Sequence, residues 1–287
     1  MAGTGMKDIK RRIKSVESTR QITKAMELVA SSKMRRAKER AERTRPQFRL
    51  LYETISDIAS RNRDLSSPYV KARPVRGSCV VVVAGDRGLA GGYNSNVFKS
   101  AQALMDTLKN PMVVPIGRKA AEYFHKRSIP ILQLDEKLTS TVEYFGMKQA
   151  FQLSQWLCQS YLAGKFDVMY IVYTNFVSAL SQQPGSLCML PISKVATATV
   201  SKREILYEPS AVAVFERIVP QYIAGLLYGA VTESFASEQA ARRTAMESAT
   251  DNADEMIEQL GLQYNQARQG AITKEITEIA AGAQAAQ

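Results

Sequence analysis

The stretch that decides the fold runs from Ala30 to Ile58 and reads ASSKMRRAKERAERTRPQFRLLYETISDI. Apolar or small residues recur in it at alternating steps of four and three. They are Ala30, Met34, Ala37, Ala41, Thr44, Phe48, Leu51, Ile55 and Ile58. This spacing is typical of a coiled-coil seam, and it is kept over four heptads. The sequence therefore predicts one long helix whose seam packs against a partner helix.

The predicted helix covers residues 3–60, although its stripe changes near the start. The seam residues upstream are Ile9, Ile13 and Val16, and a shifted stripe follows with Ile22, Met26 and Val29. Because Arg20 and Glu27 occupy the original seam positions, we expect a stutter or a change of partner surface there. Pro46 is expected to kink the helix or to remove one hydrogen bond. Such a helix would be about 85 Å long, too long for a small core to bury both of its ends.

A different period begins after a polar linker, residues 62–77, that contains two prolines. Apolar and largely β-branched runs predict strands, and apolar residues at helical spacing predict helices between them. The predicted strands are 78–84, 112–116, 129–134 and 168–173. The predicted helices are 96–109, 118–126 and 143–162. Alternation of strands and helices indicates a Rossmann-like, open α/β domain.

The last segment is helical again, and its apolar stripes drift around the helix. They contain Met246, Ala249, Ala253, Met256, Ile257, Leu260, Tyr264, Ala267, Ala271, Ile272, Ile276, Ile279 and Ala283. This drift favours a partner that winds around the helix. We therefore expect an N-terminal coiled-coil helix at residues 1–62, a central α/β domain at 75–207 and a C-terminal coiled-coil helix at 208–287. The two terminal helices are expected to pair antiparallel, with the α/β domain inserted between them.

The net charge of +11 is unevenly distributed along the chain. Residues 1–60 hold 15 basic and 7 acidic residues, whereas residues 208–287 hold 5 basic and 11 acidic residues. Ends of opposite charge are expected to lie side by side. Because an exposed ion pair contributes about 0.2–1 kcal/mol, the apolar seam holds such a pair together and charge mainly sets its register.

Composition argues against several functional classes. Cys79, Cys158 and Cys188 are far apart and fit buried hydrophobes in a reducing compartment, and His125 is the only histidine. A metal site, a cofactor or a catalytic triad is therefore not expected. No apolar run reaches the roughly 18 residues of a membrane span, and no signal or transit peptide precedes the first helix. We expect a protein used on the cytoplasmic side, without direct membrane insertion.

Two motifs leave other functions open. Residues 85–92 read GDRGLAGG between a predicted strand and a predicted helix, where glycine-rich turns can hold phosphates. The motif matches neither the dinucleotide-binding nor the P-loop pattern, so a structural tight turn is favoured over a nucleotide-binding enzyme. The basic first helix could bind nucleic acid. Since no aromatic residues alternate with its positive charges, a solvated face or a face for acidic protein loops is the simpler interpretation.

Four blocks carry a resemblance to a known family. They read DIKRRI at 8–13 with QITKAMELVASSKM at 21–34, DRGLAGGYNSN at 86–96, ASEQAARRTAMESATDNA at 236–253 and ARQGAITKEITEIAAGA at 267–283. The chain resembles the gamma subunit of the F-type rotary ATP synthase, of bacterial type. The last block is similar to that family's signature I-T-x-E-(L/I)-x-E-I-V-x-G-A, with Ala280 where valine is usual. Residues 110–200 match the family only in pattern.

The resemblance implies a rotor shaft in the central stalk, with no catalytic residue or cofactor of its own. In that family the terminal helices run up the axis of a ring of alpha and beta subunits. The α/β domain lies next to the epsilon subunit and the membrane c-ring. Ion flow turns the c-ring and the shaft, which couples ion translocation to ATP synthesis or hydrolysis. The chain is thus expected to be peripheral at the cytoplasmic face of the cell membrane, without nucleic acid.

The resemblance also assigns subunit contacts by position, in three groups. The upper group, which in the family hydrogen-bonds beta-subunit loops, is Arg268, Gln269 and Thr273. The lower group, in the region that faces acidic beta-subunit loops, is Lys24, Met26, Arg242 and Arg243. The foot group, near the c-ring loops, is Tyr207 and Glu208. Thiol regulation of the chloroplast type is not expected, because residues 193–208 contain no cysteine.

Overall fold

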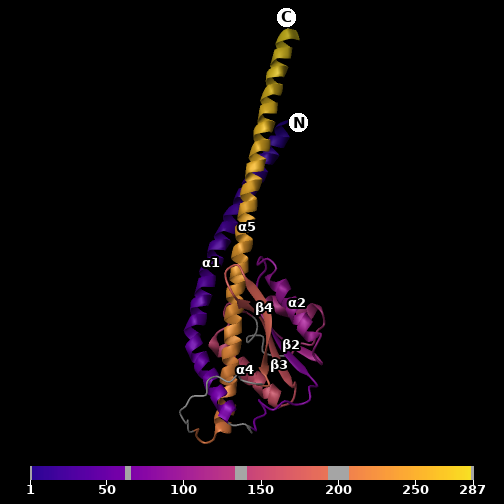
Figure 1. Ribbon diagram of the computed structural model, residues 1–287. Coiled ribbons are helices and arrows are strands. Elements are labelled where there is room, and N and C mark those ends of the chain that lie inside the picture. The colour runs from indigo at the N-terminus through magenta and orange to yellow at the C-terminus, as the bar shows by residue number, and fades with distance from the viewer. Residues whose placement is uncertain (1, 62–65, 133–140, 193–206, 286–287) are drawn as a thin grey trace. The chain divides into compact units, whose positions relative to one another are not determined.

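The structure is a computed structural model that describes residues 2–61, 66–132, 141–192 and 207–285. Its elements are α1 (Ala2–Arg61), β1 (Ser78–Val83), α2 (Tyr93–Met105), β2 (Pro111–Ile116), α3 (Arg118–Lys126), α4 (Met147–Leu162), β3 (Val168–Phe176), β4 (Gln182–Leu190) and α5 (Ala211–Ala285) (Figure 1). The chain divides into two compact units. One holds the residues up to 30 and from 242 onward, and the other holds residues 31–241. The predicted three-segment division of the chain stays a prediction.

The unit of residues 31–241 is built around a four-stranded sheet in the order β2-β1-β3-β4. β1 pairs parallel with β2 and with β3, and Val81 lies between Val114 and Ile171. All six residues of β1 are buried, as expected for a parallel strand that is covered on both faces. β4 closes the sheet antiparallel to β3. The predicted open α/β architecture is confirmed.

Two strands differ from the prediction. β4 was not predicted, because Gln182, Pro184 and Gly185 interrupt any apolar alternation; an edge strand tolerates such residues. The predicted strand at 129–134 is only an isolated parallel bridge between Ile131 and Val113 in the part of it that the structure describes. Residues 133 and 134 lie outside the described ranges.

Each face of the sheet has its own core. On one face, Val80 and Val82 pack with α2 and α3, including Val97 and Phe124. On the other face, the alternate β1 residues pack with α4 and with parts of both terminal helices. That second core includes Cys79, Val81, Val83, Leu153, Leu157, Ile55, Ile58, Phe215, Val219, Ile223 and Leu227. The terminal helices are thus part of the layer that covers the sheet.

Within the same unit, α1 and α5 pack directly against each other. The rings of Phe48 and Tyr222 stack with their centroids 5.6 Å apart. Gly225 permits this approach, because a Cβ there would lie 2.9 Å from Cδ2 of Phe48. α1 runs on through Pro46 as one helix. Seam residues such as Ala37, Ile55 and Ile58 are buried, as their spacing predicted.

The unit formed by the two chain ends is an antiparallel helix pair. The hydroxyls of Thr23 and Thr250 are 2.8 Å apart, and Arg20 forms an ion pair with Asp254. Figure 1 shows α1 beginning alongside α5 at a point short of the C-terminal end of α5. The predicted stutter is wrong. Buried Thr23 keeps the heptad step between Val16 and Ala30, so the seam continues without a shift.

Candidate subunit-contact sites

The C-terminal turns of α5 form an exposed helix with an apolar stripe. Every residue from 272 to 281 is exposed. Ile272, Ile276 and Ile279 are 47%, 62% and 67% exposed. Their spacing by four and three places them on one side of the helix. Large apolar side chains grouped in this way mark a surface that another molecule covers.

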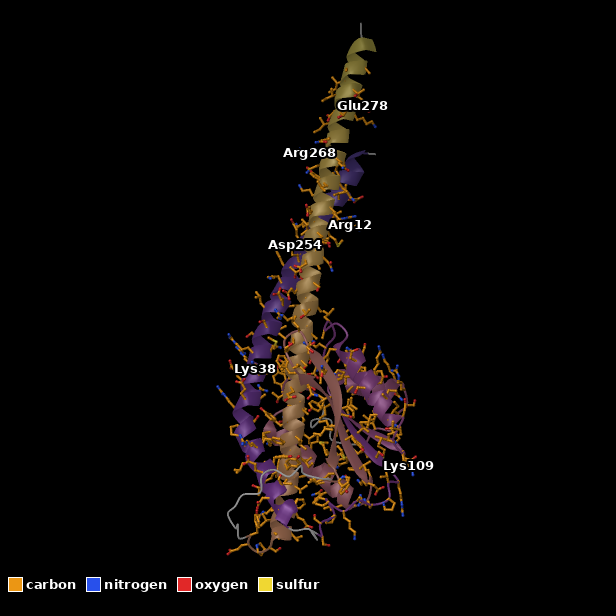
Figure 2. The ribbon with its side chains drawn as sticks, viewed as in Figure 1. Arg12, Lys38, Lys109, Asp254, Arg268 and Glu278 are labelled. Carbon is orange, nitrogen blue, oxygen red and sulfur yellow. The ribbon has the colours of Figure 1, made fainter. Side chains whose placement is uncertain are left out.

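The upper group of predicted contacts lies beside this stripe. Arg268, Gln269 and Thr273 are all exposed, and Figure 2 shows Arg268 and Glu278 projecting from α5. The Thr273 hydroxyl donates to the Gln269 carbonyl oxygen at 2.9 Å, so its remaining hydrogen-bonding capacity is as an acceptor. Helical spacing puts Arg268 on the same side as Ile272 and Ile279. Polar groups therefore flank an apolar stripe, as at the edge of a protein interface.

The lower group does not form one cluster. Lys24 is exposed, and its Nζ donates to Glu27 at 3.0 Å within α1. Met26 is half-buried. Arg242 is buried, whereas the partly buried Arg243 has Nη1 3.8 Å from Oε2 of Glu247. The Thr23–Thr250 contact places Lys24 about two helical turns away from Arg242 along α5.

Sequence reasoning missed an apolar patch on α1 next to Lys24. Ile22, Leu28 and Val29 are each more than half exposed. The signal was present as the shifted stripe Ile22, Met26 and Val29, for which a change of partner surface was one expected explanation. Because the seam itself continues through Thr23, the stripe is a second surface of α1.

The two foot residues differ in their surroundings. The Tyr207 hydroxyl donates to Oδ2 of Asp57 at 2.9 Å, and its ring packs on the core beside the sheet. Asp57 is buried near the end of α1, so Tyr207 joins the segment before α5 to that helix. Glu208 is exposed. Of this pair, Glu208 is thus the residue that offers its charge to solvent.

The glycine-rich turn at residues 85–92 is held by its own chain. The Asp86 carboxylate accepts backbone N–H groups from Arg118 at 3.3 Å, Val142 at 2.9 Å and Glu143 at 3.3 Å. The Glu143 side chain accepts a 2.6 Å bond from Lys33 of α1. The turn therefore links three segments, which supports its interpretation as a structural turn.

Two of the three cysteine thiols are buried, whereas Cys188 is exposed, so the expectation of a buried cysteine is wrong for Cys188. Burial raises the pKa of the Cys79 thiol, and it raises the pKa of the Cys158 thiol to about 12. Neither group supplies a thiolate near neutral pH. The described ranges contain no cluster of His, Cys, Asp or Glu side chains that could hold a metal ion. Among the helices that the structure describes, none combines the length and apolar character needed to cross a bilayer.

Comparison with known proteins identifies the family. A family model described as ATP synthase matches residues 5–286. The ATP synthase gamma chain of Ruminococcus albus is 47% identical over 278 residues, which cover 96% of each chain. The chain belongs to the ATP synthase gamma chain family. Another gamma chain, from Alkaliphilus metalliredigens, is 43% identical over 99% of each chain. The sodium ion specific gamma chain of Acetobacterium woodii is 38% identical over 98% of each.

Solved structures share the gamma-chain fold. A chain of the Euglena gracilis mitochondrial ATP synthase matches with a TM-score of 0.65 at 19% identity, covering 99% of this chain and 95% of that one. A chain of the Tetrahymena thermophila mitochondrial ATP synthase central stalk and c-ring matches with a TM-score of 0.56 at 22% identity, covering 79% of this chain and 99% of that one. The predicted combination of paired terminal helices and an α/β domain is confirmed.

Proposed function

We propose that this chain is the central-stalk rotor of a bacterial ATP synthase. It transmits torque between a membrane c-ring and a ring of alpha and beta subunits. The observation that carries the proposal is the isoleucine stripe on the exposed end of α5. An exposed apolar stripe on a helix is unfavourable in water, whereas a shaft inside a protein ring buries such a stripe.

The chain is a non-catalytic subunit. The buried thiols of Cys79 and Cys158 and the self-contained glycine-rich turn support this role. Bond making and breaking then belong to the beta subunits, and this chain acts on them through its surface. Whether the coupling ion is a proton or sodium is decided in the c-ring, so the proposal holds for either ion.

The proposed contacts follow the three groups of residues. Arg268, Gln269 and Thr273 present donors and acceptors to beta-subunit loops beside the isoleucine stripe. Lys24 and Met26, with the apolar patch on α1, face the acidic beta-subunit loops, which a basic helix attracts. Arg242 and Arg243 lie about two helical turns farther along α5, so they form a separate part of the proposed contact region. Glu208 faces the c-ring, with Tyr207 anchoring its segment, and the epsilon subunit lies next to the α/β domain.

Under this proposal, the protein is peripheral at the cytoplasmic face of the cell membrane. Attachment occurs through the c-ring and requires no membrane-spanning segment in this chain. The first test is co-purification of the tagged full-length chain. If the ring contains three pairs of alpha and beta subunits, each of these subunits should be recovered in about threefold excess over the tagged chain. Recovery of the chain with nucleic acid and without these subunits would contradict the proposal.

The second test is removal of the last 12 residues. In membrane vesicles, ATP-driven ion pumping should fall further than ATP hydrolysis, because the shortened shaft loses contacts with the beta subunits. A matched control is the double substitution Lys274→Ala and Glu278→Ala, which removes an exposed ion pair from the same turns and keeps the stripe. Unchanged pumping per ATP in the truncated complex would count against contact of the stripe residues Ile276 and Ile279 with the beta subunits.

A further inference from the structure

The sheet has a place where open α/β proteins bind their ligands. In the order β2-β1-β3-β4, the chain leaves β1 toward β2 on one side and later enters β3 on the other side. Ligands of such sheets bind beyond the carboxyl ends of the strands, where the order reverses. Here that place lies at the ends of β1 and β3, next to the glycine-rich turn. The structure shows what fills it.

Two serines of α5 bind the end of β3. The pairing of β1 with β3 ends at Val82 and Val172, so Thr174 extends past the last pair. The Thr174 N–H donates to Oγ of Ser234 at 3.0 Å, and the Ser237 hydroxyl donates to the Thr174 carbonyl oxygen at 3.3 Å. Both serines are fully buried. The helix thus supplies the two hydrogen bonds that a neighbouring strand would otherwise make.

The next residue along α5 fills the crevice beside the turn. Glu238 is only 3% exposed. A Cβ on Gly85 would lie 2.8 Å from both Cδ and Oε1 of Glu238, so its carboxyl group rests against the first glycine of the turn. The Gly85 N–H is already bonded to Oδ1 of Asn94 at 2.9 Å. A carboxyl group in this place occupies the position where a dinucleotide-binding sheet holds phosphate, and it leaves no room there for a second group.

We propose that α5 permanently fills the crevice where other open α/β proteins bind a ligand. Ser234, Ser237 and Glu238 are positioning residues that lock the α/β domain onto α5. The torque role of this lock rests on the proposed rotor function. The close-packed apolar contacts of α5 resist rotation of the domain through the fit of their side chains, and hydrogen bonds add a directional restraint. Hydrogen bonds weaken steeply when they are bent. The two serine bonds therefore fix the rotational position of α5 against β3.

The lock itself is tested on the isolated full-length chain by hydrogen exchange. With Ser234→Ala and Ser237→Ala combined, the Thr174 amide should exchange about tenfold faster or more, since its buried N–H loses its acceptor. The matched control is Thr232→Val. Thr232 is buried on the same helix, but its hydroxyl donates within α5, to the Tyr228 carbonyl oxygen at 2.8 Å. Equal Thr174 exchange in the serine variant and the control would overturn the lock.

The torque role is tested in the assembled complex with Gly85→Ala. Its φ lies outside the left-handed region, so alanine fits the backbone. Its methyl group displaces the Glu238 carboxyl group, at 2.8 Å, more than Oδ1 of Asn94, at 3.2 Å. The control is Gly92→Ala in the same turn, where an added Cβ comes no closer than 3.6 Å to another residue. The complex with Gly85→Ala should pump fewer ions per ATP hydrolysed than the wild-type complex, and the complex with Gly92→Ala should pump as many as wild type. Equal pumping per ATP in the two variants would overturn the torque role.

A double substitution shows whether the methyl group acts through Glu238. Gly85→Ala combined with Glu238→Ala should pump like Glu238→Ala alone, because the methyl group then has no carboxyl group to displace. Additive losses would contradict this route. If the wild-type chain fails to assemble with alpha and beta subunits, the rotor function is wrong, and Thr174 exchange still decides whether α5 is locked in the crevice.

Discussion

Two stretches of α5 have similar apolar content and opposite surroundings. Between residues 215 and 240, Phe215, Val219, Ile223 and Leu227 are completely buried against the sheet layer. Between residues 272 and 281, every residue is exposed, including three isoleucines. One helix is thus stabilised by its own chain in the first stretch and left for another protein in the second. The stability of the chain and its assembly can therefore be disturbed separately.

The largest effect is expected from matched isoleucine substitutions in the two stretches. Ile223→Ala should lower the free energy of unfolding of the isolated chain by roughly 2–5 kcal/mol, because it leaves a cavity in the core. Ile276→Ala should change it by less than about 0.5 kcal/mol. Urea unfolding measures both values. In the complex, Ile276→Ala should instead reduce coupling, and a large stability loss from it would remove the contrast between the stretches.

The next largest effect is expected from Asp167, a buried carboxylate that stabilises the unit of residues 31–241. Backbone N–H groups of Arg76 and Gly77, with the Arg73 guanidinium, lower the pKa of Asp167. Asp167→Asn should cost roughly 1–3 kcal/mol at pH 7. Because the folded pKa lies below the unfolded value of about 3.9, this stabilisation exists above that pH. It disappears as the pH falls through the folded pKa.

The measurement is urea unfolding of wild type and Asp167→Asn at several pH values. Their difference should be constant near neutral pH and shrink below about pH 4. Asp106→Asn is the control, because Asp106 is exposed and accepts a bond from Gln102 of its own helix. If the stability difference between wild type and Asp167→Asn stays constant down to about pH 2, the hydrogen bonds and the ion pair of the Asp167 carboxylate are not its cause.

A smaller effect is expected from two glycines one turn apart on α5. Gly225→Ala should destabilise the chain by about 1–2 kcal/mol, because its Cβ would press on the Phe48 ring. Gly229→Ala meets no atom within 4 Å and should stabilise by about 0.5–1 kcal/mol through helix propensity. Thermal unfolding compares the two variants. Equal shifts would show that α1 does not pack closely at Gly225.

The smallest effect is expected from the ion pair between the chain ends. Arg20 and Asp254 are both about half exposed. A double-mutant cycle with Arg20→Met and Asp254→Asn should give a coupling energy of about 0.2–1 kcal/mol that declines with added salt. A value above about 2 kcal/mol would mean that charge, rather than the seam, holds the helix pair together.

The helices and the central strands followed from local pattern, whereas the exceptions depend on distant residues. β1 contains a run of four valines and was therefore predicted, but β4 contains Pro184 and is a strand only because β3 lies beside it. Arg20 and Glu27 made the seam look interrupted, and the contact of Thr23 with Thr250 shows that the seam continues between them. A threonine counts as polar when only the sequence is considered. Its hydroxyl can nevertheless be buried in the seam when it lies against another hydroxyl, as Thr23 does with Thr250.

The candidate sites divide in the same way. The apolar stripe at Ile272 and Ile276 is visible in the sequence, but its exposure depends on where α1 begins beside α5. The burial of Arg242 cannot be read from the sequence, because neighbouring Arg243 has the same residue type and is less buried. Ser234 likewise resembles any helical serine. Its role depends on the point where the pairing of β1 with β3 ends, which leaves Thr174 without a partner on the β1 side.

The pairing of Thr174 with Pro184 has a consequence for the newly made chain. Thr174 directs its N–H and its carbonyl group to α5, so this pair is a non-hydrogen-bonded pair of the β3–β4 ladder. The nitrogen of Pro184 consequently faces the outer edge of the sheet. A proline there has no N–H to offer an incoming strand, and edge strands protected in this way resist sheet-to-sheet aggregation. At Pro184, therefore, β4 offers no N–H group to a strand of another copy of the chain.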